Sequence, residues 1–168
     1  YRDIWKGAAN LWWPVHATLT PEDLARHYDS VVRIGLTLTV TVGLAILAAT
    51  WRTGPVTPLN RDAVLKLATI SAAAVPFVLP KMHDRYFFMA EVMVLLLALT
   101  NRRYWPAVLL MQGSGALAYC GHEDILGFKA LMGAGPMHWL SLALMVAAIA
   151  CIFWPPRRFE RAAPIPAE

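Results

Sequence analysis

Long apolar stretches alternate with short polar connections along most of this chain. A helix needs ~20 apolar residues, within a range of about 17 to 25, to cross the hydrocarbon core of a bilayer. Five stretches come close to that length, although the third is short. They run over Val31–Trp51, Ala63–Leu79, Tyr86–Leu99, Tyr104–Cys120 and Met137–Trp154. The pattern predicts an all-α fold, a polytopic membrane bundle of about five transmembrane helices.

The two ends of the chain depart from this pattern. Residues 1–30 are aromatic and mixed in charge, which predicts an external or interfacial segment. Within it, the pair Thr20-Pro21 marks the start of a helix, with the threonine as N-cap. Residues 31–154 form the predicted transmembrane bundle, and the proline-rich tail 155–168 is predicted to be cytoplasmic and disordered. Because the sequence begins at Tyr1 rather than at a methionine, we expect the C-terminal part of a longer protein, or a product trimmed at its front.

Composition strengthens the membrane assignment and excludes other classes. Hydrophobic residues make up 58% of the chain, charged residues make up 15%, and the mean hydropathy is +0.48, so an ordinary soluble domain is not expected. The net charge of +4 comes without a basic run interleaved with aromatic residues, so we expect no nucleic-acid partner. Cys120 and Cys151 lie in apolar stretches without CxxC or CxxH spacing, and they indicate no redox or metal motif.

Basic residues predict the side of the membrane on which each connection lies. If five helices alternate in direction, the connections after the first and third helices share a side with the tail. Counted from Arg52 onward, that side carries Arg52, Arg61, Lys66, Arg102, Arg103, Arg157, Arg158 and Arg161. The opposite side carries Lys81, Arg85 and Lys129. By the positive-inside rule the first side is cytoplasmic, which places all five histidines outside: His16, His27, His83, His122 and His138.

The segment with the most chemistry lies where the second apolar stretch meets the third. His83, Asp84 and Arg85 stand side by side there, and Glu91 follows inside the third stretch. Charge clustered at a membrane edge is a functional-site hypothesis, because lipid penalises uncompensated charge by several kcal/mol. The residue types suit a lipid phosphate: Arg85 offers bidentate donors, His83 can donate a further hydrogen bond, and Asp84 would orient either of them. The structural alternative is a salt bridge that anchors the helix at the interface.

Helical spacing groups part of this segment on one face. Asp84, Phe88 and Glu91 are spaced at i, i+4 and i+7. Glu91 would then lie about 10 Å deeper than Asp84, where it needs a partner such as Lys81 or Arg85. A buried hydrogen bond between helices is the structural alternative for Glu91.

Two motifs carry a resemblance to a known family. The run Lys-Met-His-Asp-Arg-Tyr-Phe-Phe-Met-Ala-Glu over 81–91 resembles the Met-His-Glu-Arg-Tyr-Phe-Tyr…Ala-Asp signature of bacterial GT-C-type integral-membrane glycosyltransferases. Asn-Leu-Trp-Trp over 10–13 resembles the element that precedes the C-terminal helices of the same proteins. The motifs occur in matching order, so the resemblance covers most of residues 1–154. Asp84 replaces the usual Glu and Glu91 the usual Asp, and both replacements keep the charge.

The resemblance implies transfer of a sugar from a polyprenyl-phosphate donor to an acceptor at the external face of the bacterial cytoplasmic membrane. This part of the enzyme would bind the donor phosphate through His83, Asp84, Arg85 and Tyr86, supported by Lys81, Glu91, Asn10 and Trp13. In this family the catalytic base is an acid on an external loop of the N-terminal half. We expect that half to be missing here, so no catalytic residue is assigned. The missing half or a partner membrane subunit is the expected partner.

Several alternatives stay open in the sequence. One is a transporter or flippase-like membrane module in which a buried histidine and acid relay protons or bind substrate, and another is a non-catalytic scaffold subunit. His122, Glu123 and Asp124 form a second external cluster whose ligand types suit a divalent cation, Mg²⁺ or Mn²⁺. Adjacent residues rarely point to one ion, so a solvated loop is the alternative there. Trp13 can equally be an interfacial anchor, and Asn10 a helix cap.

Overall fold

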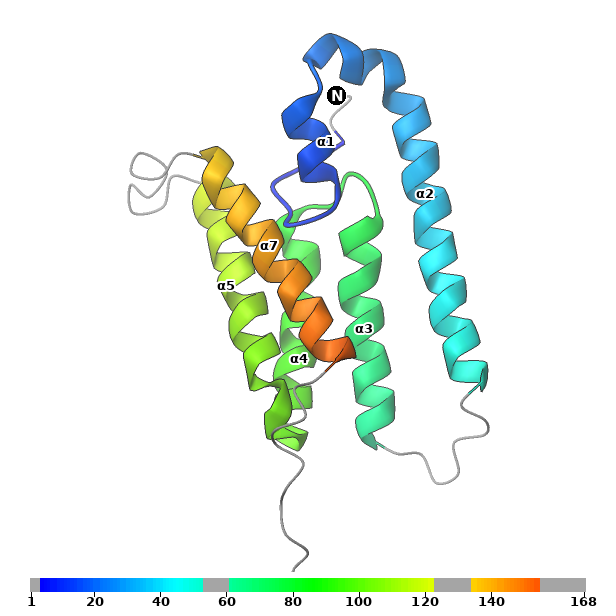
Figure 1. Cartoon of the computed structure of the whole chain (residues 1–168), viewed down its shortest axis with the longest axis vertical. Coiled ribbons are helices and arrows are strands. Elements are labelled where there is room, and N and C mark those ends of the chain that lie inside the picture. The colour runs from blue at the N-terminus through cyan, green and yellow to red at the C-terminus, as the bar shows by residue number, and fades with distance from the viewer. Residues whose placement is uncertain (1–3, 53–60, 123–133, 155–168) are drawn as a thin grey trace, which may run out of the picture.

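The computed structural model describes residues 4–52, 61–122 and 134–154. These residues form helices and short connections, with no β-sheet among them (Figure 1). In chain order the elements are α1 (Trp12–Thr18), α2 (Pro21–Arg52), α3 (Arg61–Val78), the 3₁₀ turn η1 (Asp84–Phe87), α4 (Phe88–Thr100), the 3₁₀ turn η2 (Arg102–Tyr104), α5 (Trp105–His122) and α7 (Ala134–Phe153). Each apolar stretch of the sequence coincides with a helix, which confirms the all-α prediction.

Two of the described helices are long and apolar enough to cross a membrane. They are α2, over Pro21–Trp51, and α7, over Gly135–Phe153. The apolar part of α3, Ala63–Val78, is shorter. The α-helix α4 is also shorter than the predicted third stretch, because the residues just before it form η1. Length and composition are thus weakly consistent with a membrane protein, with two candidate spans among the described residues, and the predicted bundle of five spans is not confirmed.

The start of α2 confirms the predicted capping signal. The Thr20 hydroxyl accepts a hydrogen bond from the Asp23 backbone N–H at 3.2 Å and donates one to the Asp23 carboxylate at 2.7 Å. This arrangement satisfies one of the free N–H groups of the first turn. The helix then continues without a break to Arg52. The predicted boundary between residues 30 and 31 therefore falls inside one helix.

The core forms where α3, α4, α5 and α7 meet, and its fully buried side chains include Leu97, Met111 and Met145. The helices α5 and α7 pack closely along most of their length. Two buried serines join them reciprocally. The Ser114 hydroxyl donates to the Ser141 carbonyl oxygen at 2.7 Å, and the Ser141 hydroxyl donates to the Ser114 carbonyl oxygen at 2.7 Å. Small residues that hydrogen-bond across a helix pair are typical of packing inside membranes.

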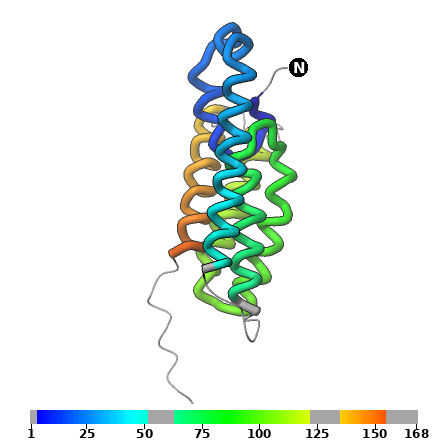
Figure 2. The backbone as a smooth tube through the Cα atoms, turned by 90° about the vertical axis from the view of Figure 1, so that its right-hand side faces the viewer, coloured from blue at the N-terminus to red at the C-terminus, as the bar shows by residue number. Residues whose placement is uncertain are grey.

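The helix α2 stands beside this core (Figures 1 and 2). It packs chiefly against α3, and several of its large apolar side chains are exposed: Ile34, Leu36, Val40, Leu44 and Leu47. In its N-terminal half α2 approaches the rest of the molecule closely at Gly35. A Cβ atom there would lie 2.6 Å from Pro80 Cδ and 2.7 Å from Trp12 Cζ2. Only a glycine allows α2 to lie this close to those two rings.

The N-terminal segment, residues 4–11, packs against the connection between α3 and η1. The Lys81 backbone N–H donates to the Ile4 carbonyl oxygen at 2.8 Å. Just after the segment, the Trp12 indole N–H donates to the Val78 carbonyl oxygen at 2.8 Å. Residues far apart in sequence thereby fix the connection that leads into η1.

The connections alternate between the two ends of the molecule. The helix α1 and the connection between α3 and η1 lie at one end, and η2 lies at the other, together with the last turn of α2 (Figure 1). The helix α7 also ends toward the η2 side (Figure 1). The segment 83–86 and the pair Arg102-Arg103 therefore lie at opposite ends, as the alternating arrangement predicts.

Candidate functional site

The candidate site begins at a tight turn that precedes α4. His83 has extended backbone angles, φ −81° and ψ 155°. Its carbonyl oxygen accepts a hydrogen bond from the Tyr86 backbone N–H at 3.1 Å. The Asp84 carboxylate accepts one from the Arg85 backbone N–H at 2.9 Å. These local bonds close η1 and fix the Asp84 carboxylate before the α-helix starts.

The N-terminal segment holds the approach to this turn. Lys81 has a φ of 65°, which is uncommon for a residue with a side chain. Its backbone N–H is the one bonded to Ile4. His83 forms isolated backbone bridges with Lys6 and Gly7. Surrounding contacts of this kind are what maintain an unfavourable backbone angle.

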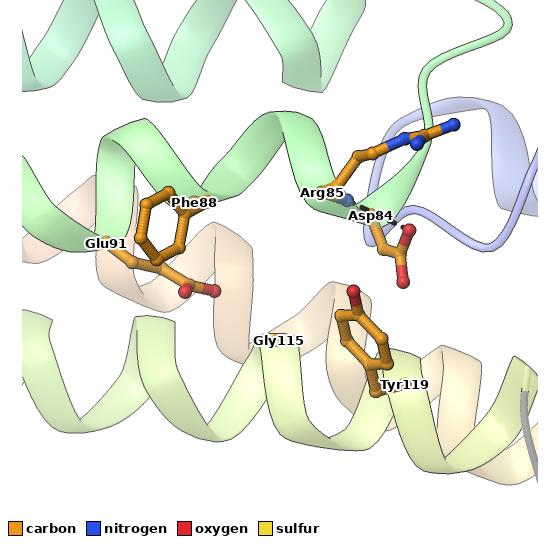
Figure 3. A pocket seen from close by; sticks show the side chains of 6 residues that line it. All are labelled: Asp84, Arg85, Phe88, Glu91, Gly115 and Tyr119. Atoms are coloured by element: carbon orange, nitrogen blue, oxygen red, sulfur yellow. Dashed lines mark hydrogen bonds between the residues drawn. The ribbon is translucent and has the colours of Figure 1, made fainter.

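A pocket of about 270 Å³ opens between this turn and α5. It is lined by Asp84, Arg85, Phe88, Glu91, Gly115 and Tyr119. In Figure 3 the Glu91 carboxylate points toward α5 near Gly115, and the Tyr119 hydroxyl points toward the Asp84 carboxylate. The Arg85 guanidinium points away from both Glu91 and Tyr119. The inner wall of the pocket is therefore acidic, and its cation lies at the rim.

Gly115 makes the room that the Glu91 side chain occupies. A Cβ atom at position 115 would collide with Glu91 Oε1, so a larger residue there would displace the carboxylate. At Gly113 the same addition would meet only Leu144 Cδ1, at 3.5 Å, which is an ordinary van der Waals distance. The requirement for glycine on this part of α5 is thus specific to position 115.

The pocket offers acceptors, one phenol and apolar ring surface. The carboxylates of Asp84 and Glu91 accept hydrogen bonds, and the Tyr119 hydroxyl can donate or accept. The Phe88 side chain is 65% exposed and provides an apolar surface. The exposed Arg85 guanidinium can meet an anion at the rim. A ligand with several hydroxyl groups and one anionic group would match this set.

The sequence-predicted residues separate into two groups around this pocket. Asp84, Arg85 and Glu91 line it, together with Phe88, as the helical spacing predicts. His83 and Tyr86 are not among the lining residues, although they adjoin Asp84 and Arg85 in the chain; their ring centroids lie 6.3 Å apart.

Lys81 does not take the predicted place beside Glu91. Its ammonium group lies 4.7 Å from the centroid of the Tyr28 ring instead. The backbone bond of Lys81 to the N-terminal segment directs the residue toward α2 and away from α4. Arg85, the other expected partner of Glu91, directs its guanidinium away from that carboxylate (Figure 3).

Asn10 and Trp13 lie in a separate aromatic cluster. The buried Trp13 ring packs against Trp5 at 4.7 Å and against His138 at 4.8 Å between centroids. The Asn10 carboxamide oxygen accepts a hydrogen bond from the Trp12 backbone N–H at 3.1 Å, at the start of α1. The N-cap residue of α1 is Leu11, which makes no side-chain capping bond, so Asn10 closes a local turn just before the helix and does not cap it. The motif over 10–13 contacts the end of α3 through the Trp12–Val78 hydrogen bond, just before the motif over 81–91 begins. Only the motif over 81–91 contributes residues to the pocket.

Two lining residues were not predicted from the sequence. Gly115 and Tyr119 are four residues apart on α5 and so share a face, but the sequence does not reveal that this face meets α4. In the proposed cation cluster, Glu123 and Asp124 lie outside the described residues, as does the side chain of His122. Within the described ranges no group of three or more His, Cys, Asp or Glu residues could hold a metal ion.

The assignment of a function rests on this geometry and on the sequence motifs. No family model, no curated protein and no solved structure matches this chain.

Proposed function

We propose that this chain is the donor-binding, C-terminal portion of a GT-C-type membrane glycosyltransferase. The substrate is a polyprenyl-phosphate sugar, and the acceptor receives the sugar at the external face of a bacterial cytoplasmic membrane. In this proposal all five apolar helices cross the bilayer, the short ones shielded by their neighbours. The catalytic base is supplied by an acid on the part of the enzyme that precedes this chain, or by a partner subunit.

The observation that carries the proposal is the pairing of an acidic pocket wall with a cation at the rim. Asp84 and Glu91 face α5, whereas the Arg85 guanidinium points outward. A sugar phosphate needs both kinds of group, because hydroxyl groups donate to carboxylates and phosphate oxygens accept from guanidinium. The turn η1, which contributes Asp84 and Arg85 to the pocket, lies at the end of the molecule that also carries the aromatic α1 (Figure 1), as expected at headgroup depth.

This arrangement assigns distinct roles to the residues. Arg85 binds the phosphate bidentately, and His83 donates a further hydrogen bond to the leaving phosphate. The sugar ring enters the pocket, where Asp84, Glu91 and Tyr119 bind its hydroxyl groups. Phe88 covers the apolar face of the ring, and the prenyl chain extends along the exposed surface of α4. Transfer also requires a general base to take the proton of the acceptor. In this proposal that base is the acid outside this chain, and none of the pocket residues takes its role.

A binding assay that separates retention from transfer tests the proposal. The purified chain is reconstituted in nanodiscs with a radiolabelled polyprenyl-phosphate hexose, and bound lipid and transferred sugar are scored separately. We expect saturable retention of the donor and no transfer. The matched ligand is the same polyprenyl chain without phosphate and sugar, which should not compete. Failure of the folded chain to retain the donor, or equal competition by the bare polyprenol, would exclude the donor-site assignment.

A further inference from the structure

A second groove, at the opposite end of the molecule, has no part in the proposed transfer reaction. It lies between the last turns of α2 and the first half of α3, and its volume is about 340 Å³. Its lining residues are Ala49, Thr50, Ala63, Val64, Lys66, Leu67 and Ile70. All but Thr50 and Lys66 are apolar. The groove therefore combines an apolar wall with one cationic group.

The charge environment of this groove favours an anion. The Lys66 side chain is half-buried, and the Arg103 guanidinium of η2 interacts with it electrostatically as a like charge. Arg102, next to Arg103, is exposed at the same end. Two cations that repel each other at the edge of a low-dielectric region are both stabilised when an anion lies between or beside them.

We propose that the α2–α3 groove binds an anionic phospholipid, with an acyl chain along the apolar wall and the phosphate on Lys66. Basic pockets between transmembrane helices are known to hold acidic lipid headgroups. A soluble phosphate would leave the apolar wall unused, whereas a phospholipid satisfies both parts of the groove. The helix α2 stands beside the core and packs chiefly against α3, so the groove between these two helices lies at the edge of the molecule (Figure 1). An acyl chain can therefore reach it from the surrounding lipid. This inference depends on the membrane location of the chain and is independent of glycosyl transfer.

Lipid retention by the reconstituted chain tests this site directly. The chain is purified from nanodiscs that contain phosphatidylglycerol and phosphatidylcholine, and co-purified lipid is quantified by mass spectrometry. We expect enrichment of phosphatidylglycerol, reduced about fivefold in Lys66→Gln and preserved in Lys66→Arg. Ala63→Phe keeps the charge and fills the groove, so it should also lose the lipid. Arg26→Gln, an exposed arginine near the other end of α2, is the matched control and should behave as the unaltered chain.

Three outcomes would overturn the proposal. Lys66→Gln that retains phosphatidylglycerol as well as the unaltered chain would remove Lys66 from the site. Displacement of the lipid by soluble glycerol phosphate would identify a free anion as the ligand. Cross-linking of a second copy across α2 and α3, with no enrichment of lipid, would show that protein covers the groove. Because a polyprenyl-phosphate sugar is itself an anionic lipid, its retention is also measured in Lys66→Gln, which disables the α2–α3 groove and leaves the pocket at the opposite end intact. Each proposal can then fail without the other.

Discussion

At the scale of single residues, the candidate site depends on which way two neighbouring charges point. Asp84 and Arg85 are adjacent in sequence and line one pocket, yet Figure 3 shows that the Arg85 guanidinium is directed away from the inner wall. The bond from the Arg85 backbone N–H to the Asp84 carboxylate ties the acid to the turn. The arginine side chain is therefore free to reach outward. A ligand can then meet an anion-binding and a hydroxyl-binding surface within one short segment.

The first prediction concerns the geometry of the cation at the rim. Replacement of Arg85 by lysine keeps the charge but removes the planar pair of donors. We expect Arg85→Lys to retain the polyprenyl-phosphate sugar about tenfold less tightly, ~1.4 kcal/mol, with unchanged stability. Arg33→Lys, at an exposed position on α2, is the control and should have no effect. Unaltered retention by Arg85→Lys at subsaturating donor would show that Arg85 does not bind the phosphate.

The second prediction compares two glycines of α5. Gly115→Ala places a methyl group where the Glu91 carboxylate lies, whereas Gly113→Ala meets only an ordinary contact. Because alanine favours helices over glycine by up to about 1 kcal/mol and the Glu91 side chain can move, neither change should destabilise the chain. We expect donor retention to fall about tenfold in Gly115→Ala alone, since a displaced carboxylate loses its hydrogen bonds to the ligand. Equal retention by the two variants would mean that the position of Glu91 does not matter.

At the scale of elements, small residues set the distances between helices. Ser114 and Ser141 bring α5 and α7 together, Gly115 accommodates Glu91, and Gly35 allows α2 to reach Pro80. These positions are scattered in sequence, but each lies where two elements meet. At the α4–α5 contact it is Gly115 that leaves room for the Glu91 carboxylate and so for the acidic wall of the pocket.

The third prediction tests the reciprocal serine pair. Each hydroxyl donates to the backbone carbonyl oxygen of the other serine, and alanine keeps that oxygen. We therefore expect Ser114→Ala and Ser141→Ala each to lower the free energy of unfolding by roughly 0.6 kcal/mol, the average for hydrogen bonds between membrane helices. Denaturation of the reconstituted chain in mixed micelles measures it. Thr37→Val is the control, because the Thr37 hydroxyl donates only to the Arg33 carbonyl oxygen of its own helix, at 2.9 Å. Unchanged stability in both serine variants would show that the pair does not stabilise the α5–α7 contact.

The fourth prediction uses two glycines of α2. A Cβ atom at Gly35 would overlap the rigid rings of Pro80 and Trp12, whereas Gly43 has open space around it. We expect Gly35→Ala to lower the free energy of unfolding by about 1 to 3 kcal/mol, as overpacking does. Gly43→Ala should leave it unchanged or raise it by up to about 1 kcal/mol. Thermal denaturation of both variants provides the comparison, and equal stabilities would place α2 further from Pro80 than the structure has it.

Some elements were predictable from the sequence because their signals are local. The apolar runs mark the helices, and the Thr20 cap marks the start of α2. The 3₁₀ turn before α4 was not predicted, because a helical pattern does not distinguish it from a first α-helical turn. The wall supplied by Gly115 and Tyr119 was also missed, since the pairing of helix faces depends on packing across the whole bundle. The position of Lys81 over Tyr28 reflects a similar long-range contact.

At the scale of the whole molecule, the pocket beside η1 and the α2–α3 groove lie at opposite ends and differ in charge. Among the described residues, two carboxylates and one arginine line the pocket, whereas Lys66 is the one charged residue that lines the groove. One end carries α1 and the turn η1, which helps to line the pocket with two carboxylates (Figures 1 and 3). The other end carries η2 with Arg102 and Arg103, and the groove that contains Lys66. From Arg52 onward the basic residues are more numerous at the η2 end, as the positive-inside rule expects of a cytoplasmic side, whereas Lys6, Arg26 and Arg33 lie toward the α1 end.

The final prediction is therefore the orientation of the chain in the membrane. Single cysteines at the exposed positions Tyr86 and Arg102 are introduced after both free cysteines, Cys120 and Cys151, have been replaced by alanine. We expect a membrane-impermeant maleimide to label Tyr86→Cys in intact spheroplasts, and to label Arg102→Cys only after permeabilisation. The physical reason is that cytoplasmic connections retain Lys and Arg during insertion. Labelling at 102 but not at 86 would invert the topology, and would move the acidic pocket away from the external face on which the proposed transfer depends. Labelling at both positions without permeabilisation would instead show that the chain does not span the membrane between them.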